Sequence, residues 1–570
     1  QFEIEYGSSA LDKITVKYYK GLGTSTAEDG KEYFRNLSKN VQNFVYSPET
    51  GEALKVVFCS SRISDRKKWI ENRATEYSAS CPTKRDITYD DFIHNDLIQY
   101  SRADIIRSLP SAIDGLKNSQ RKVLYTCLHK GIRSDMKVLQ LAGSVTELTS
   151  YHHGDRSLIS AIIRMAQDYV GASNLPLLVP SGQFGTRHKG GKDAAQGRYI
   201  FTRLSPIARH IYHEADDPIL TYAKEDGKTV EPVNYLPIIP MLLVNGSTGI
   251  GTGWSTEIPL YNPLDVVRHV EQLVRGISPS RQLHPWVRGF KGEIRRDEEI
   301  YQCNGVIKRT SGTVVEISEL PVGRWTESFK ENLAKLSQKS KISFTSMREM
   351  HTVDRVRFQL HAPRAVWDNL EIKPGGLMKL FSLSSTISLK NMHGFDTDMK
   401  LRKFDTAEDI VNVHYSARLD GYERRRENVL QLLRAEEMMT RNRSRFIREV
   451  ISGDISLIRS GVPVSDAEIK GLLLRRGYAT AQDISRLRHG DEMVEGNSSS
   501  DNFGYLLSMP MRSLTSDQAD NLGSRAASAE SKLSDAVKRS AHDMWLHDLG
   551  VLETELVKHD PTYDTTRSTK

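Results

Sequence analysis

Apolar and polar positions follow two different rhythms along this chain. In Asp155–Val170 apolar side chains recur every three or four positions, which predicts an amphipathic helix. Residues 258–404 alternate instead, with Val356, Phe358 and Leu360 on one face, which predicts strands that have one buried side. We therefore expect a mixed α/β multidomain protein in which helical and strand-rich regions follow one another.

The helical region resembles a small DNA-binding unit in its layout. A helix is expected to begin near Ser119, and Val138–Leu148 and Asp155–Val170 form two more, separated by a short turn that ends at Gly154. Two helices joined by a short glycine turn in a basic setting are typical of helix-turn-helix and winged-helix units. This region is therefore a candidate to bind nucleic acid.

Two long helices are predicted near the C-terminal end, one from about 406 to 450 and one from Thr515 to about His559. The first has an apolar seam with arginines beside it: the seam is Tyr415, Leu419, Tyr422, Val429 and Leu433, and the arginines off it are Arg418, Arg424, Arg425 and Arg434. The second begins with a capping box at Thr515–Gln518, and its apolar stripe is Leu522, Ala526, Ala529, Leu533 and Val537. Two antiparallel helices with a small domain between them predict an arm with a dimer-forming tip; plain helix packing is the alternative.

Positive charge is concentrated in two segments. The chain of 570 residues has a net charge of only +7, but Arg102–Lys137 holds eight Lys or Arg against three Asp, and Gln183–Arg209 holds six against one. Concentrated charge suits a polyanion better than an evenly charged surface does. A solvated basic face is the alternative.

Length and composition narrow the class of protein further. A chain of 570 residues exceeds what one hydrophobic core supports, so three to four domains are expected. The four cysteines form no CxxC pair, which favours a reducing compartment and argues against a zinc site. The longest apolar stretch, Leu236–Val244, is too short to span a membrane, and there is no signal-peptide pattern. The chain opens on Gln1 without methionine, which suggests a fragment boundary.

The strongest candidate chemistry lies in the glycine-rich segment Gly182–Phe201, where Tyr199 follows Arg198. A phenol is protonated at neutral pH, so a nucleophilic tyrosine needs a base or a metal-assisted route, together with cations that stabilise the charge of the transition state. Arg107 on the other basic segment can bind phosphate oxygens, and His153 can move a proton near neutral pH. In the alternative interpretation Tyr199 is a structural hydrogen-bond donor and His153 belongs to a capped turn.

A second glycine-rich segment, Gly246–Gly253, does not fit a nucleotide loop. A P-loop needs a lysine after its last glycine, and a dinucleotide loop needs the GxGxxG spacing after a strand. If Ile250 is held out on the turn, it could wedge between base pairs and bend DNA. A buried core isoleucine is the alternative.

Several motifs that occur in one order along the chain resemble those of eukaryote-type DNA topoisomerase II. They are Lys17–Thr26, Asp114–Val123, Leu141–Gly154, Gln183–Thr202, Glu231–Ser255, Pro285–Phe290, Glu316–Trp325 and Tyr505–Thr515. The resemblance covers nearly the whole chain and identifies it as the DNA-binding and cleavage region of a type IIA enzyme. It implies a mixed α/β fold with a winged-helix DNA-binding domain, an α/β tower and a long antiparallel helical arm with a dimer-gate tip.

The resemblance also implies domain boundaries and residue roles. The boundaries are 1–83 for the end of a metal-binding TOPRIM domain and linker, 84–257 for the winged helix with the catalytic tyrosine, 258–405 for the tower, 406–455 and 515–560 for the arm, 456–514 for the tip and 561–570 for a tail. Tyr199 would form a reversible link to a DNA 5′-phosphate, and Arg198, Arg107, His153 and Lys117 would surround the scissile phosphate. Ile250 would intercalate, and the other DNA contacts would be Lys20, Arg121, Lys122, Lys137, Arg187, Lys189 and Lys192.

The expected partners are double-stranded DNA and a second copy of the chain. The family's metal acids, a Glu-Gly-Asp-Ser motif and an Asp-x-Asp pair, do not occur ahead of Lys17–Thr26. We therefore expect no metal ligand in this chain, with Mg²⁺ held by a segment upstream of residue 1 and ATP used by a separate domain or polypeptide. The resemblance implies a nuclear enzyme if the source is a eukaryotic cell, and host cytoplasm or nucleus if it is viral. A catalytically silent DNA-bending protein and a dimerisation scaffold are the rival interpretations.

Overall fold

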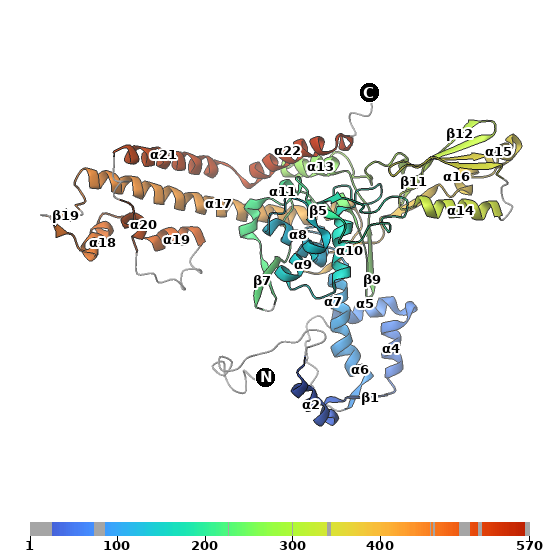
Figure 1. Ribbon diagram of the computed structural model, residues 1–570, viewed down its shortest axis with the longest axis horizontal. Coiled ribbons are helices and arrows are strands. Elements are labelled where there is room, and N and C mark those ends of the chain that lie inside the picture. Colours follow the sequence, from blue (N-terminus) through green and yellow to red (C-terminus); the bar gives the residue numbers. More distant parts are fainter. Residues whose placement is uncertain are drawn as a thin grey trace.

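A computed structural model describes residues 25–72, 86–225, 227–298, 300–338, 344–456, 458–459, 462–489, 502–510 and 516–564. Figure 1 shows a central body from which a long helical arm extends on one side and a sheet-rich lobe on the other, with the N-terminal helices below it. The chain is mixed α/β, as the sequence predicts. Among the described residues, none of the helices has the length and apolar character that crossing a membrane requires.

The N-terminal part is small and mostly helical. Its elements are α2 (Ala27–Arg35), α3 (Leu37–Asn40), β1 (Asn43–Val45), α4 (Thr50–Phe58), α5 (Ile63–Asn72), β2 (Asp86–Thr88), α6 (Tyr89–Phe92), η3 (Ile93–Leu97) and α7 (Ile98–Ser108). Thr26 and Asp29 form a capping box at the start of α2.

The central body contains the predicted helix pair. Its helices α8 (Asn118–His129), α9 (Val138–Thr149) and α10 (Asp155–Ala166) pack around the largest core, and β3 (Met136–Lys137), β5 (Phe201–Leu204) and β4 (Leu178–Ser181) form an antiparallel sheet in that order. The turn between α9 and α10 begins at Ser150, whose φ is 47°, and ends at Gly154. Helix α10 ends at Ala166, four residues before the predicted Val170. The next residue, Gln167, has an extended backbone, and its buried side chain donates to the carbonyl oxygens of Phe184 (2.8 Å) and Gly191 (3.3 Å).

The rest of the central body connects this unit to the other regions. Its elements are α11 (Ala208–Ile211), η4 (Glu214–Ile219), β6 (Tyr222–Glu225), β7 (Lys228–Pro232), α12 (Met241–Asn245), β8 (Ser247–Gly251), β9 (Trp254–Ile258) and α13 (Pro263–Val274). Strands β8 and β9 form a hairpin that packs on α7. This hairpin carries Ile250 and brings it to the same cavity as α10.

The lobe contains two separate sheets. One is β10 (Glu293–Asp297), β11 (Ile300–Asn304) and β16 (Ser384–Ser388), and the other runs in the order β12 (Val306–Ser311), β13 (Val314–Glu319), β15 (Phe358–His361) and β14 (Ser346–Glu349). Helices α14 (Thr326–Gln338), α15 (Arg364–Glu371) and α16 (Gly376–Leu380) complete it. Phe358 and Leu360 are fully buried, which confirms the predicted alternation, whereas Val356 is buried just ahead of its strand.

The arm differs from its prediction in two respects. The first helix, α17 (Ala407–Ile451), matches the expected length, but the second is interrupted: α21 (Ser516–Lys538) ends before α22 (Ala541–His559) begins. Ser540 and Asp543 form a capping box at the break, and this local hydrogen bonding starts a new helix. Because Thr515 lies outside the described residues, the capping box predicted there is not seen.

The arginines of α17 also differ from the prediction. Arg418 and Arg425 were expected off the apolar seam, yet both are buried where α17 meets η4 and α22. Carboxylates on those neighbouring elements pair with them, which makes burial possible. At the far end of the arm, α18 (Asp466–Arg475) and α20 (Gly504–Leu507) pack with the end of α17 around a small separate core, and α19 (Ala481–His489) also packs on α17.

Candidate active site

The candidate nucleophile, Tyr199, is exposed on an irregular segment that leads into β5. The backbone on both sides of it is tied to the start of α9, because the amide of Leu139 donates to the carbonyl of Gly197 (3.1 Å) and that of Val138 donates to Ile200 (3.0 Å). The side chain itself is 68% exposed. The guanidinium carbon of Arg198 lies 5.6 Å from the centre of the phenol ring. The segment therefore presents a tyrosine and an arginine to solvent from a fixed backbone.

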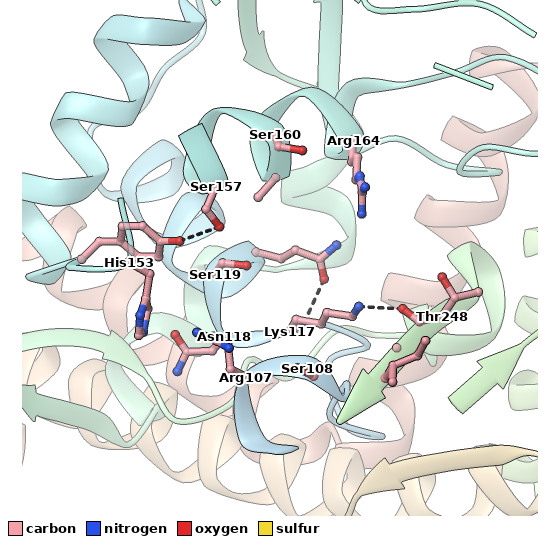
Figure 2. A pocket seen from close by; sticks show the side chains of 15 residues that line it. Arg107, Ser108, Lys117, Asn118, Ser119, His153, Ser157, Ser160, Arg164 and Thr248 are labelled. Atoms are coloured by element: carbon pink, nitrogen blue, oxygen red, sulfur yellow. Dashed lines mark hydrogen bonds between the residues drawn. The ribbon is translucent and has the colours of Figure 1, made fainter. Parts of the chain in front are cut away.

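A cavity of about 600 Å³ collects several of the predicted site residues. Arg107 comes from the end of α7, Lys117 from the residue before α8 and His153 from the turn before α10, and Ile250 from β8 completes the set. Figure 2 shows the side chains that line this cavity around one opening. Four segments between residues 107 and 250 thus meet in one polar depression.

Lys117 is the most constrained cation of this cavity. Its Nζ donates a hydrogen bond to the carbonyl oxygen of Thr248 (2.6 Å), which ties the start of α8 to the β8–β9 hairpin. Burial lowers the pKa of Lys117, and the positive charge of Arg164 lowers it further. A lysine whose charge is destabilised by its surroundings gains more from a bound anion than an ordinary surface lysine does.

Arg107 and His153 line the same cavity from different elements. Arg107 pairs with Asp104 on its own helix (3.2 Å), and the Arg107 side chain is 46% exposed, so it is also accessible to another anion. The His153 ring packs beside His152, with 4.2 Å between the ring centres. Both side chains therefore keep contact with the cavity without being enclosed by the protein.

Ile250 stands at the edge of the cavity and is 84% exposed. The glycines beside it let the hairpin approach α7 closely, since a Cβ on Gly249 would overlap the carbonyl oxygen of Ser108. The alternative of a buried core isoleucine is therefore wrong. The glycines of this segment serve close packing.

A second cavity, of about 770 Å³, lies between α10 and the tyrosine segment. Its cations are Arg156, Arg164, Lys192 and Arg198, and apolar side chains of α9 and α10 form the remaining wall. The two cavities share Ser160 and Arg164, so they are adjacent. Tyr199 lines neither of them and lies next to Arg198 at the border of the second.

Three of the predicted DNA contacts are corrected by the structure. Arg121 forms a bidentate pair with Asp114 (2.6 and 3.1 Å), and Lys122 binds Glu231 and Glu225 (2.8 and 3.1 Å). Arg187 forms an ion pair with Glu319 on β13. All three are less than 9% exposed and already hold carboxylate partners, so they stabilise the fold and are not available to phosphates.

The other residues predicted to contact DNA differ in their surroundings. Lys137 is exposed on β3, where it pairs with Phe201 of β5. Phe201 follows Tyr199 by two residues. Lys189 is half exposed and lies 3.5 Å from Glu327, and Lys192 lines the second cavity. Lys20 lies outside the described residues.

Sequence reasoning missed the contribution of one face of α10. Ser157, Ser160 and Arg164 all line the first cavity, and Arg164 points towards Lys117 in Figure 2. Their spacing of three and then four places them on one side of the helix, which was a readable signal. The prediction considered only the apolar stripe of the helix and overlooked this opposite face.

The described residues do not provide a metal site. Within them, no group of three or more His, Cys, Asp or Glu side chains is arranged to hold a metal ion. Neither cavity has an aspartate or glutamate among the described residues that line it. These residues therefore suit an anion and do not fit the acid cluster that Mg²⁺ requires.

Comparison with known proteins gives consistent matches. The family model of the A-type subunit of DNA gyrase/topoisomerase IV matches residues 107–550, and that of the C-terminal associated domain of TOPRIM matches residues 4–105. A mitochondrial DNA topoisomerase 2 of Dictyostelium discoideum is 38% identical over 98% of this chain and 42% of its own length, and a DNA topoisomerase 2 of Arabidopsis thaliana is 39% identical over 96% and 38%. The chain thus spans about two fifths of these relatives.

A solved structure is similar over the whole chain. The DNA-binding, cleavage and re-ligation domain of Plasmodium falciparum topoisomerase II superposes with a TM-score of 0.81 at 33% identity, and the match covers 100% of this chain and 78% of that one. The DNA gyrase/topoisomerase IV model by itself covers far more than half of the residues. The chain therefore belongs to the DNA gyrase/topoisomerase IV family of type II topoisomerases.

Proposed function

We propose that this chain is the DNA-binding and cleavage region of a type IIA DNA topoisomerase, in which Tyr199 forms a transient 5′-phosphotyrosine link at a double-strand break. The observation that carries the proposal is the exposed Tyr199 beside Arg198, next to two adjacent cavities whose charged lining residues are all basic or histidine. The backbone of DNA is a polyanion that such a surface attracts. No observation favours the silent DNA-bending alternative.

In the proposed reaction the Tyr199 oxygen bonds to phosphorus and the bond from phosphorus to the 3′ oxygen breaks. The phenol proton leaves and the 3′ oxygen gains a proton, so charge and atoms balance, and re-ligation is the reverse. His153 is the group in the cavity suited to accept and return a proton. Arg107, Lys117 and Arg198 stabilise the extra negative charge of the transition state, each by about 3 kcal/mol if they act as typical preorganised donors.

The proposal includes the DNA-bending residue and the quaternary arrangement. Ile250 inserts between base pairs, because an isoleucine that is 84% exposed on a rigid hairpin is a suitable wedge. A homodimer supplies one tyrosine per strand, with residues 84–257 as a winged-helix domain, 258–405 as the tower and the arm tip as a second dimer contact. Duplex passage and the use of ATP and Mg²⁺ are proposed from family membership alone. No step is assigned to the metal because the described residues do not form its site.

The proposed compartment follows the genome that the enzyme serves. A eukaryotic source places it in the nucleus or, since one relative is named as mitochondrial, in an organelle, and a viral source places it in host cytoplasm or nucleus.

The test is detergent trapping of covalent protein–DNA adducts with the full-length protein and magnesium. Tyr199→Phe should abolish the adduct on the 5′ end while the dissociation constant for duplex DNA changes by less than about twofold, because the phenol oxygen is the nucleophile and the basic surface binds. Tyr46→Phe is the matched control, since Tyr46 is 72% exposed in the N-terminal part. A wild-type protein that binds and bends DNA without any adduct would support the silent DNA-bending interpretation instead.

A further inference from the structure

The segment that carries Tyr199 is held against the lobe by a buried ion pair. Arg187 and Glu319, the last residue of β13, are 4% and 2% exposed, and their side chains form a direct hydrogen-bonded pair. The same Arg187 nitrogen donates to the carbonyl of Leu320 (3.1 Å). Glu319 accepts further hydrogen bonds from the backbone amides of Leu320 (2.8 Å) and Lys291 (3.1 Å). These contacts together hold the carboxylate in one orientation.

Three more contacts lie beside this pair and join the same two segments. The amide of Glu327 donates to the carbonyl of His188 (3.1 Å), and the Lys189 and Glu327 side chains form a half-exposed pair. Gly190 packs directly on Trp325, where a Cβ would overlap the indole ring. We call these contacts of residues 187–190 with Glu319, Trp325 and Glu327 the loop clamp.

The tyrosine segment is rigid between the loop clamp and Tyr199. The amide of Gly191 donates to the carbonyl of Thr186 (2.9 Å), and the Thr186 amide donates to Asp193 (2.9 Å). The amide of Ala195 then donates to Gln183 (2.9 Å). These hydrogen bonds link the loop clamp to Ala195, four residues before Tyr199, and the amide of Tyr199 donates to the carbonyl of Gln196 (2.9 Å).

We propose that the ion pair between Arg187 and Glu319 positions Tyr199 for attack, so that the β13–α14 junction is a positioning element for DNA cleavage. This inference rests on the proposed function of Tyr199. Arg187 acts through the loop and touches no DNA. The physical reason is that nucleophilic attack depends steeply on geometry, and a misplacement of about 1 Å can slow a reaction about a hundredfold.

The chain offers a matched pair of substitutions for the test. Glu319→Gln removes the charge of the buried partner and leaves Arg187 unpaired, whereas Glu327→Gln makes the same change in the half-exposed pair a few residues away. With the full-length protein, the rate of adduct formation at saturating duplex should fall at least about tenfold for Glu319→Gln and less than about twofold for Glu327→Gln. The duplex dissociation constant and its salt dependence should stay within about twofold of the wild type for Glu319→Gln.

A positioning role is separated from a purely structural one by hydrogen exchange and by a second variant. The amides of Gly191, Ala195 and Tyr199 should exchange faster in Glu319→Gln at a temperature well below its Tm. The double variant Arg187→Gln with Glu319→Gln buries no unpaired charge, so it should fold even if the single variant does not, and it should recover part of the adduct rate.

Where the wild type forms an adduct, two results would overturn the inference. An unchanged adduct rate in folded Glu319→Gln, despite a lower Tm, would mean that the pair only stabilises the fold. Weaker duplex binding with a smaller salt dependence would mean that Arg187 contacts phosphate. Absence of any wild-type adduct would instead refute the proposed function. In that case, unchanged amide exchange in Glu319→Gln would separately show that the ion pair does not order the tyrosine segment.

Discussion

Arginine has opposite roles in two regions of this molecule. Beside Tyr199, Arg164 and Arg198 line open cavities, and none of the described residues that line those cavities is acidic. At the base of the arm, Arg418 and Arg425 are buried and bind Asp216 and Asp548 at 2.9 and 2.8 Å. A buried guanidinium that is paired with a carboxylate of the protein stabilises the fold. An exposed guanidinium is available to a ligand even where, as for Arg107 and Asp104, it has a partner at the surface. Burial together with a carboxylate partner therefore decides the role of an arginine.

The buried region, which we call the arm-base cluster, consists of Arg418, Arg425, Asp216, Asp548 and Tyr422. Tyr422 lies between the two arginines, with the Arg418 guanidinium carbon 3.9 Å from its ring centre, and its hydroxyl donates to Asp548 (2.8 Å). The cluster joins α17 to η4 and α22, so it fixes the direction in which the arm leaves the central body.

The largest predicted effect comes from breaking the arm-base cluster. Asp216→Asn leaves Arg418 buried without its counter-charge, and the free energy of unfolding should fall by about 3–5 kcal/mol. Urea unfolding followed by tryptophan fluorescence measures this, because Trp545 stacks on Tyr422. Glu427→Gln is the control, since its pair with Arg434 is about half exposed, and it should cost less than about 1 kcal/mol. Equal losses of unfolding free energy in Asp216→Asn and Glu427→Gln would contradict the distinction between buried and exposed arginine pairs.

A smaller effect is expected from acid, through His414 beside the cluster. Burial lowers the pKa of His414 to about 3; the hydrogen bond to the Pro237 carbonyl opposes this shift, and the positive charge of Arg418 contributes to it. The folded state therefore keeps the imidazole neutral where the unfolded chain binds a proton, so stability is complete above about pH 6.5 and is lost as the pH falls towards 3.

At pH 5 this linkage should remove about 2 kcal/mol of the free energy of unfolding relative to pH 7. Urea titrations at both pH values measure it. His414→Gln should flatten the pH dependence, and His547→Gln on the exposed side of α22 should not. A wild-type protein equally stable at both pH values would show that His414 is not held neutral.

The smallest predicted effect concerns an arginine that lines the two cavities, Arg164. Arg164→Gln should weaken duplex binding about tenfold and reduce the slope of log affinity against log salt by about 1, with no change in Tm, because its charge faces the two cavities without a carboxylate partner among the described residues. Arg364→Gln, whose side chain is 79% exposed on the lobe, should change neither quantity. A lower Tm with unchanged affinity for duplex DNA would show that Arg164 stabilises the fold and does not bind the duplex.

The elements that the sequence predicted well are those defined by local pattern. Val138–Leu148 is α9 almost to the residue, and the helix from about 406 to 450 is α17, because helical periodicity and caps act over a few residues. The interruption before α22 was also local, since Ser540 and Asp543 form a capping box, and the predicted apolar stripe ends at Val537, just before it. Arg418 and Arg425 could not be predicted as buried, because their carboxylates lie on other elements.

The sequence by itself determined the α/β character, the helix pair, the long first helix of the arm and, through motifs in order, the family and the candidate Tyr199. Tertiary structure alone decided which cations can meet a ligand. Arg121, Lys122 and Arg187 look like surface charges in the sequence, and each is instead paired in the interior with an acidic residue. The physical reason is that a buried charge is tolerated only with a partner, and partners distant in sequence meet only when the chain folds.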